Sequence, residues 1–261
     1  MKKISAILFI CSIGVAVQAQ LIDDFSTNSS ADYNQAIVLA QSADPAAVFG
    51  IASSPAGTLQ VSQSSFTSGA QQDVYIRNDG WSLGVGQTLM IDVVSPFQNS
   101  VYSDFGLALM ETASPTSVTW ASGTADGRNG LLDLYIKGQY GTVGYRASNS
   151  ANTQLYSSSG VNVNGGVTAL TGLWISRPSS TEFDVGYSTA SGNTLVKAMT
   201  GMDTAMGTGL GFYSDMRANT TYGYLDNLQI LPDVVPEPTS LAFLGLGGLL
   251  ALFGVMRRKA A

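Results

Sequence analysis

Two carboxylates are the side chains of this sequence best placed for acid–base chemistry. Glu182 and Asp184 stand two residues apart in a run whose apolar residues alternate, so a strand would place both on one face. Two carboxylates can act as nucleophile and as acid/base in the hydrolysis of a glycosidic bond when they lie about 5–5.5 Å apart. The pair is therefore the first candidate for catalysis.

The residues around this pair resemble a known catalytic strand. Residues 182–187, Glu-Phe-Asp-Val-Gly-Tyr, resemble the Glu-x-Asp-x-x-Glu strand of the concanavalin-like β-glucanases, in which two glutamates flank the glycosidic bond. Tyr187 occupies the place of the second glutamate, with Gly186 before it, so the acid/base is missing. We therefore expect a polar, solvent-facing strand without a catalytic residue, and keep Glu182 and Asp184 as candidate ligand contacts.

The tryptophans are candidates for stacking on a sugar ring, because an aromatic face supplies a large contact area. They are Trp81, Trp120 and Trp174. Aromatic residues of an all-β domain are also commonly core residues, so both interpretations stay open. Trp174 is the preferred ligand contact, since it alternates with Leu173 and Ile175 and would point away from them on a strand.

Several aspartates could contribute to a calcium site brought together by folding. They are Asp23, Asp24, Asp126, Asp203 and Asp226. Calcium takes six to eight oxygen ligands, and loop sites usually have an Asp-x-Asp-x-Asp-Gly spacing, which is absent here. Residues 126–130 are more simply a turn, so we expect no cofactor and leave calcium as an open alternative.

Composition excludes several classes of site. The chain has no histidine, and its one cysteine, Cys11, lies near the N-terminus. The body therefore has no disulfide, no cysteine nucleophile, no His/Cys zinc site and no histidine-based triad. A net charge of −6 argues against nucleic acid as a partner. Charged residues make up 11% of the chain, against about 25% in ordinary soluble domains, which is typical of a neutral, hydroxyl-rich surface.

Residues 20–232 are expected to fold as one all-β domain. Period-two alternation indicates half-buried strands over 72–77, 132–137, 143–146 and 182–187. More continuously apolar runs, over 88–94 and 105–110, indicate central strands. Turn-forming Asn, Asp and Gly residues separate these runs, which predicts an antiparallel β-sandwich.

The two ends of this body suggest how the sandwich is closed. Residues 21–25 and 223–230 resemble the first and last strands of concanavalin-like, laminin-G-like jelly rolls. In such folds these strands lie side by side. The resemblance therefore implies that the body begins and ends at the same place.

The N-terminus is typical of a secretory signal peptide. Lys2 and Lys3 precede a short apolar run, residues 4–17, and Ala19 supplies the small residue that signal peptidase requires at its cleavage site. We expect residues 1–19 to form a signal helix that is removed, so that Gln20 begins the mature protein.

The C-terminus, residues 233–261, has three parts in a fixed order. Pro236, Glu237 and Pro238 form an extended strip, because each proline lacks an N–H and disfavours helix at the residue before it. Residues 241–256 form an apolar run that would span about 24 Å as a transmembrane helix. A basic terminus follows, which would remain in the cytoplasm: Arg257, Arg258 and Lys259.

This tail resembles the PEP-CTERM sorting signal. The resemblance implies handling by an exosortase, a membrane-bound enzyme, and an association with bacteria that make exopolysaccharide and biofilm. We therefore expect a protein that is exported, held briefly in the inner membrane, and delivered to the cell surface or matrix. Its sandwich would bind glycan or act as structural matrix material; the alternative is a carbohydrate-active enzyme, similar to a glycoside hydrolase, with the same tail.

Overall fold

The computed structural model describes residues 19–41, 47–62, 71–95, 103–120, 125–216 and 224–232. The expected signal helix, apart from Ala19, and the expected transmembrane helix over 241–256 lie outside these residues. The described part contains strands and two short 3₁₀ turns, η1 (Ser30–Asp32) and η2 (Val167–Ala169). Within these ranges, no helix is long and apolar enough to cross a bilayer.

The strands form two eight-stranded sheets, here called sheet A and sheet B. Sheet A contains, in spatial order, β14 (Gly192–Met199), β13 (Glu182–Thr189), β12 (Leu170–Ser179), β6 (Gln87–Ser95), β16 (Tyr224–Pro232), β4 (Ala56–Ser62) and β3 (Val48–Ser53), with β1 (Gln20–Asp23) paired to β16. Sheet B contains β11 (Gln154–Asn162), β10 (Thr142–Ser148), β9 (Leu131–Lys137), β7 (Ser103–Met110), β15 (Gly209–Met216), β5 (Gln71–Arg77), β2 (Tyr33–Ala40) and β8 (Ala125–Asp126).

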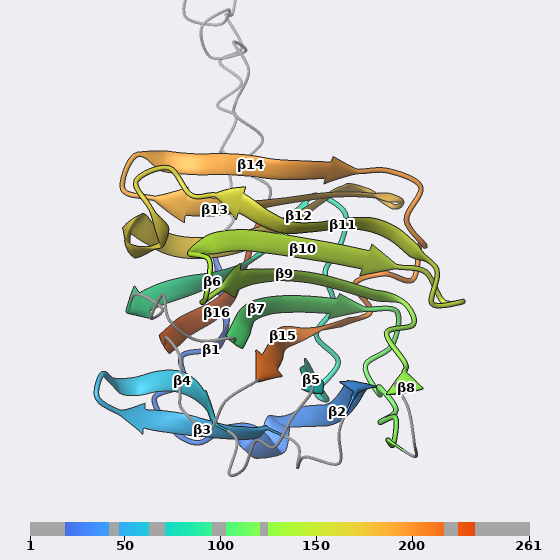
Figure 1. Cartoon of the computed structure of the whole chain (residues 1–261), viewed down its shortest axis with the longest axis horizontal. Helices are drawn as coiled ribbons and strands as arrows, with labels where there is room; N and C mark the ends of the chain where they lie inside the picture. The colour runs from blue at the N-terminus through green and yellow to red at the C-terminus, as the bar shows by residue number, and fades with distance from the viewer. Residues whose placement is uncertain are drawn as a thin grey trace, which may run out of the picture.

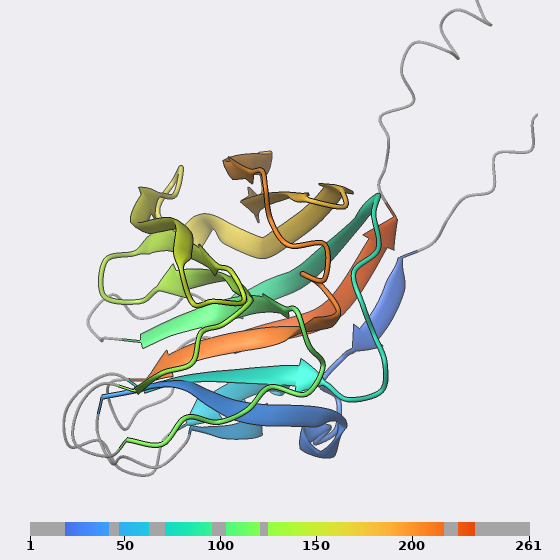
Figure 2. The ribbon, with the colours of Figure 1, turned by 90° about the vertical axis from the view of Figure 1, so that its right-hand side faces the viewer.

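The predicted antiparallel sandwich is confirmed. Neighbouring strands of the described residues run antiparallel, as between β12 and β13 or β7 and β15 (Figure 1). The first and last strands are adjacent, with Gln20 opposite Ile230. Figure 2 shows β1 and β16 side by side at one side of the molecule. The body therefore begins and ends at one place, as the resemblance to jelly rolls implied.

The core lies between the sheets and is built by alternation. Leu173 and Ile175 of β12 face inward from sheet A, and Leu134 and Ile136 of β9 face inward from sheet B. At its centre, the Phe212 ring contacts other aromatic rings with centroid distances from 4.6 to 6.4 Å: Phe25, Tyr33, Phe49, Tyr75 and Phe105. Burial of these apolar side chains from both sheets is the main stabilising term.

A buried ion pair joins the two sheets beside this core. Asp23 of β1 accepts hydrogen bonds from the Tyr33 hydroxyl at 3.0 Å and from Arg77 Nη1 at 3.3 Å, both of which belong to sheet B. Asp23 Oδ1 also accepts from the backbone N–H of Phe25 at 2.8 Å. This bond holds the left-handed backbone of Phe25 (φ 48°) and so directs its ring into the core.

The expectation of half-buried strands was wrong for much of sheet B. All seven residues of β5 are buried, and most of β9 and β10 are buried on both faces. The outer face has its own apolar cluster, which includes Val74, Ile76 and Tyr213. Its polar side chains, among them Asp133 and Arg146, bond to one another. Alternation therefore marks two different buried environments here, not a core and a solvent face.

Asp73 makes the stability of the fold depend on pH. Its side chain is fully buried on the inner face of β5 and accepts hydrogen bonds from Gln35 Nε2 at 3.2 Å and the Ala47 N–H at 3.4 Å. Burial outweighs these bonds and raises the pKa of the Asp73 carboxyl to about 7. Because the pKa is higher in the folded than in the unfolded chain, this group lowers stability as the pH rises from about 4 to about 7.

We predict that Asp73→Asn removes this loss. The variant of the full-length chain should be more stable than wild type above pH 7, by about 4 kcal/mol at most, and the difference should vanish or reverse at pH 4. Thermal unfolding of both proteins at several pH values measures the difference. If the difference in stability between variant and wild type does not change with pH, ionisation of Asp73 does not destabilise the folded protein.

Candidate functional site

The outer face of sheet A carries the predicted ligand residue. Leu173 and Ile175 are fully buried in the core. Successive residues of a strand point to opposite faces, so Trp174 and Ser176 must face outward. Trp174 lies opposite Met90 of β6 on one side and Gly186 of β13 on the other. The prediction that Trp174 points away from its neighbours is confirmed.

Gly186 allows the indole of Trp174 to lie on the sheet. A Cβ atom at position 186 would overlap the Trp174 ring and the carbonyl oxygen of Thr194, so only glycine fits beneath the ring. The indole is half-buried, and its Nε1–H has no hydrogen-bond partner among the described residues. An unpaired buried donor costs about 1–3 kcal/mol, and a hydrogen bond from this N–H to a ligand would remove that cost.

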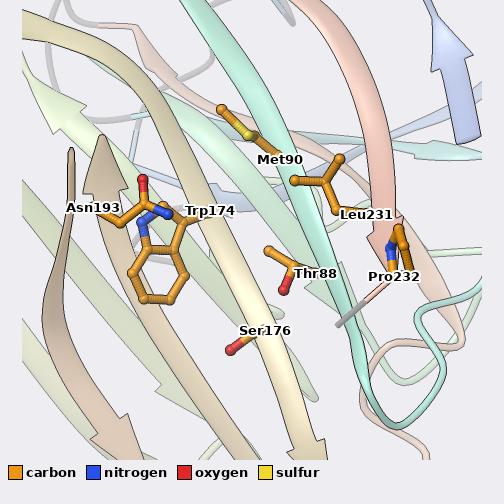
Figure 3. Close-up of a pocket in the computed structure, with 7 residues that line it drawn as sticks. All are labelled: Thr88, Met90, Trp174, Ser176, Asn193, Leu231 and Pro232. Carbon is orange, nitrogen blue, oxygen red and sulfur yellow. The ribbon is translucent and has the colours of Figure 1, made fainter. Parts of the chain in front are cut away.

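A pocket of about 280 Å³ opens beside this ring. Its walls come from four strands of sheet A, β6, β12, β14 and β16, and its lining residues are Thr88, Met90, Trp174, Ser176, Asn193, Leu231 and Pro232. Figure 3 shows Trp174 and Asn193 on one side of the pocket and Leu231 and Pro232 on the other. The lining is uncharged and combines an aromatic face with one amide and two hydroxyl groups.

Glu182 and Asp184 lie on the same outer face, beside the pocket and not in its lining. Asp184 is opposite Ser176, which does line the pocket, and Glu182 is exposed at the start of β13. Burial, and then the charge of Glu182, raise the pKa of the Asp184 carboxyl above its usual value. Tyr187 points into the core, where its hydroxyl accepts a hydrogen bond from the Asn164 N–H at 3.1 Å. No second carboxylate therefore stands at this position.

The other two tryptophans differ in environment from Trp174. Trp81 is partly buried and packs against the main core, which agrees with the core interpretation. Trp120 is exposed, in the segment between β7 and β8, away from the lining of the pocket.

Among the aspartates considered for calcium, Asp226 has a raised pKa because of burial and of the nearby charges of Asp92, Asp24 and Asp23. Asp23 is bonded to Arg77 and Tyr33, Asp126 pairs with Arg128, and Asp203 accepts a hydrogen bond from the Ala205 N–H at 2.9 Å. In the described part of the chain, no group of three or more His, Cys, Asp or Glu side chains is arranged to hold a metal ion.

Sequence reasoning missed a polar network on the outer face of sheet B. Arg146 pairs with Asp133 through Nη2 and donates from Nη1 to Gln72 Oε1 at 3.1 Å. Gln72 in turn donates to Asp215 at 3.0 Å. Burial raises the pKa of the Asp133 carboxyl, and the charge of Arg146 opposes this effect.

The same contacts show that this face is concave. Three strands separate Arg146 on β10 from Gln72 on β5, which puts them about 19 Å apart in a flat sheet. Their side chains nevertheless touch, so the sheet curves around them. Tyr135 and Tyr213 pack on this face with their centroids 5.5 Å apart, over Gly106, where a Cβ would overlap the backbone at Leu134.

Only part of this network has a signal in the sequence. Asp133 and Arg146 are opposite charges on adjacent strands of one hairpin and are direct cross-strand partners. Such a pairing follows from the expected strands and the short turn between them. The contacts to Gln72 and Asp215 depend on the curvature of the sheet, which the alternating pattern does not contain.

Comparison with protein families accounts for the C-terminus. Residues 234–259 match the model of the PEP-CTERM protein-sorting motif. The tail is a PEP-CTERM sorting motif. The predicted Pro236, Glu237, Pro238 and the basic Arg257, Arg258 and Lys259 fall within the matched range but outside the described residues. The PEP-CTERM tail marks the chain as an exported protein that is processed at a membrane.

Solved structures with a similar arrangement include several lectins. The legume lectin-like domain of Entamoeba histolytica has a TM-score of 0.49 and 9% identity, with 77% of this chain and 89% of that chain covered. Lectin I-B4 of Griffonia simplicifolia gives 0.43 and 10%, covering 80% and 96%. The lectin of Bauhinia forficata gives 0.47 and 7%, covering 82% and 97%.

These proteins are similar to this chain in the arrangement of their strands. No curated protein matches the sequence. The PEP-CTERM tail follows directly on Pro232, the last residue of β16 and part of the pocket wall.

We predict that Gly186→Ala displaces the Trp174 indole. The added methyl group has no space beneath the ring, so the free energy of unfolding should fall by about 1–3 kcal/mol, and the Trp174 indole N–H resonance should shift. Gly50→Ala on β3 is the matched control, because its Cβ would lie 3.7 Å from the nearest atom, Gln60 O. Wild-type stability together with an unchanged indole resonance in Gly186→Ala would contradict this geometry.

Proposed function

We propose that this protein is sorted to the cell surface or extracellular matrix by an exosortase and binds neutral extracellular glycan through the pocket at Trp174. The observation that carries the proposal is an outward-facing, half-buried indole beside a neutral pocket. Aromatic faces stack on the apolar faces of sugar rings, and amide and hydroxyl groups satisfy sugar hydroxyls. The unpaired Nε1–H adds a donor at the edge of the ring.

The size of the pocket supports recognition of a short part of a glycan. Its volume of about 280 Å³ lies just below that of typical ligand sites, which range from about 300 to 1,000 Å³. We infer that one sugar ring occupies the pocket and that the rest of the polymer extends over the exposed edge at β14. Such a mode suits a matrix polysaccharide, because many equivalent units along one polymer can bind.

We also propose that the sandwich binds glycan without cleaving it. Hydrolysis requires two carboxylates across one bond, about 5–5.5 Å apart in retaining enzymes and farther apart in inverting ones. Glu182 and Asp184 are two residues apart on β13, and Tyr187, which holds the place of the second glutamate, faces the core. A carbohydrate-active enzyme with the same tail is the alternative, and it would need carboxylates from another part of the chain.

We predict that Trp174→Ala weakens binding of neutral oligosaccharides about ten-fold, which corresponds to about 1.4 kcal/mol. Trp120→Ala is the control, because it removes an exposed indole that does not line the pocket. A glycan array with the full-length chain in detergent identifies the oligosaccharide, and calorimetry then compares the three proteins.

Equal losses in both variants, or no binding by wild type, would contradict the proposed site. Release of reducing sugar that Glu182→Gln abolishes would favour the enzyme alternative.

We predict that replacing Pro236, Glu237 and Pro238 by alanine blocks processing. Alanine is the best helix former, so a helix expected over residues 241–256 would be able to continue through residues 236–238, where the prolines are expected to disfavour it. The precursor should stay uncleaved in the inner membrane, measured as product size in the membrane and medium fractions. A control with alanine at Thr239 and Ser240 alters neighbouring residues without removing the motif. Normal release of the triple variant would reduce the tail to a simple anchor.

A further inference from the structure

A second cavity lies on the opposite side of the sandwich. It has a volume of about 320 Å³ and is lined by Lys137, Tyr140, Thr142 and Gly160. Lys137 ends β9, Thr142 begins β10 and is its cross-strand partner, and Gly160 belongs to the neighbouring strand β11. The cavity thus sits at the turn end of the β9–β10 hairpin.

The strand pattern places this cavity on the outer face of sheet B. Leu134 and Ile136 face the core, so Lys137 faces outward, as does its partner Thr142. The Trp174 pocket is on the outer face of sheet A. Two packed sheets are about 10 Å apart, so the two cavities face opposite directions with the whole sandwich between them.

The lining of this cavity differs in charge from that of the Trp174 pocket. The Lys137 ammonium group lies 5.0 Å from the centroid of the Tyr140 ring, which is 57% exposed. An ammonium group has three donors, and the aromatic ring satisfies none of them fully. Asp104 is opposite Lys137 on β7, on the side away from β10.

Thr142 provides an independent indication of a ligand. The residue is 7% exposed, and its Oγ1 is buried without a hydrogen-bond partner among the described residues. A Cβ atom at Gly160 would lie 3.3 Å from this oxygen, so a larger side chain there would fill the cavity beside it. The absence of a side chain at position 160 leaves room beside this buried hydroxyl group.

Lys137 also differs from most other cations of the described residues. Arg77, Arg128 and Arg146 are paired with carboxylates, and Arg177 donates to backbone carbonyl groups. Lys197 lies 5.4 Å from the Tyr156 ring, with the same kind of aromatic neighbour as Lys137. The two lysines therefore have similar aromatic neighbours, but only Lys137 is among the residues that line this cavity.

We propose that this cavity is a second glycan subsite, selective for a sugar that carries a carboxylate. The ammonium group of Lys137 binds the carboxylate, the Thr142 hydroxyl bonds to a neighbouring oxygen of the sugar, and Tyr140 covers the ring. One sandwich then holds two glycan segments of different charge on opposite faces. This subsite does not depend on Trp174, so it stands or falls separately from the function proposed above.

The test uses oligogalacturonate and its methyl ester as probes for the full-length chain in detergent. The free acid should bind, and the ester, which lacks the charge, should bind about ten-fold more weakly. Lys137→Gln should cause a similar loss for the acid and little change for the ester. Binding of the acid should also weaken with added salt.

Lys197→Gln is the matched control, since it removes a lysine of the same kind outside the cavity and should leave binding unchanged. Gly160→Val keeps the charge and fills the cavity, so it should also abolish binding. Trp174→Ala should leave oligogalacturonate binding intact. Absence of binding by wild type, equal affinity for acid and ester, or equal losses in both lysine variants would overturn the proposal.

Discussion

The ring of Phe212 lies at the centre of the sandwich, in contact with aromatic rings from both sheets. It stacks on Tyr75 with a centroid distance of 4.6 Å and meets Phe25 and Phe105 edge-on. The sequence contains one cysteine, Cys11, so no disulfide can hold residues 20–232 together. Packing must do this alone. The buried pair of Asp23 and Arg77 adds direction more than stability, because it fixes where the first strand enters this packing.

The same core determines what each outer face presents. Leu173 and Ile175 must point inward, so the position between them is presented outward from sheet A. Leu134 and Ile136 have the same effect on sheet B, where Asp133 and Lys137 are directed outward. The outer faces of the two sheets also differ because sheet B is curved. Sheet B closes over its polar groups, whereas sheet A leaves its indole open to the surface.

Alternation was enough to predict some elements and not others. It predicted β5, β9, β10 and β13, and it predicted the direction of Trp174. It missed β2, β3 and β4, it missed β11 and β14, where edge positions leave residues such as Leu155 and Leu195 exposed, and it missed β15, which is buried on both faces. β5 is also buried on both faces, but in β15 the aromatic Phe212 and Tyr213 are neighbours, one on each face, so no period-two pattern remains. The contact between Gln72 and Arg146 was also unpredictable, because it joins strands far apart in both sequence and sheet order.

The position of β16 has a mechanical consequence. The strand is hydrogen-bonded to β6 on one side and to β1 and β4 on the other, and the tail continues from its end at Pro232. Antiparallel hydrogen bonds run perpendicular to the strands, so tension along β16 loads many of them at once. Hydrogen bonds loaded together in this way withstand far more force than hydrogen bonds that are broken one at a time. A tether attached through the tail would therefore pull on a strand that is hydrogen-bonded to neighbours on both sides, beside the wall of the Trp174 pocket.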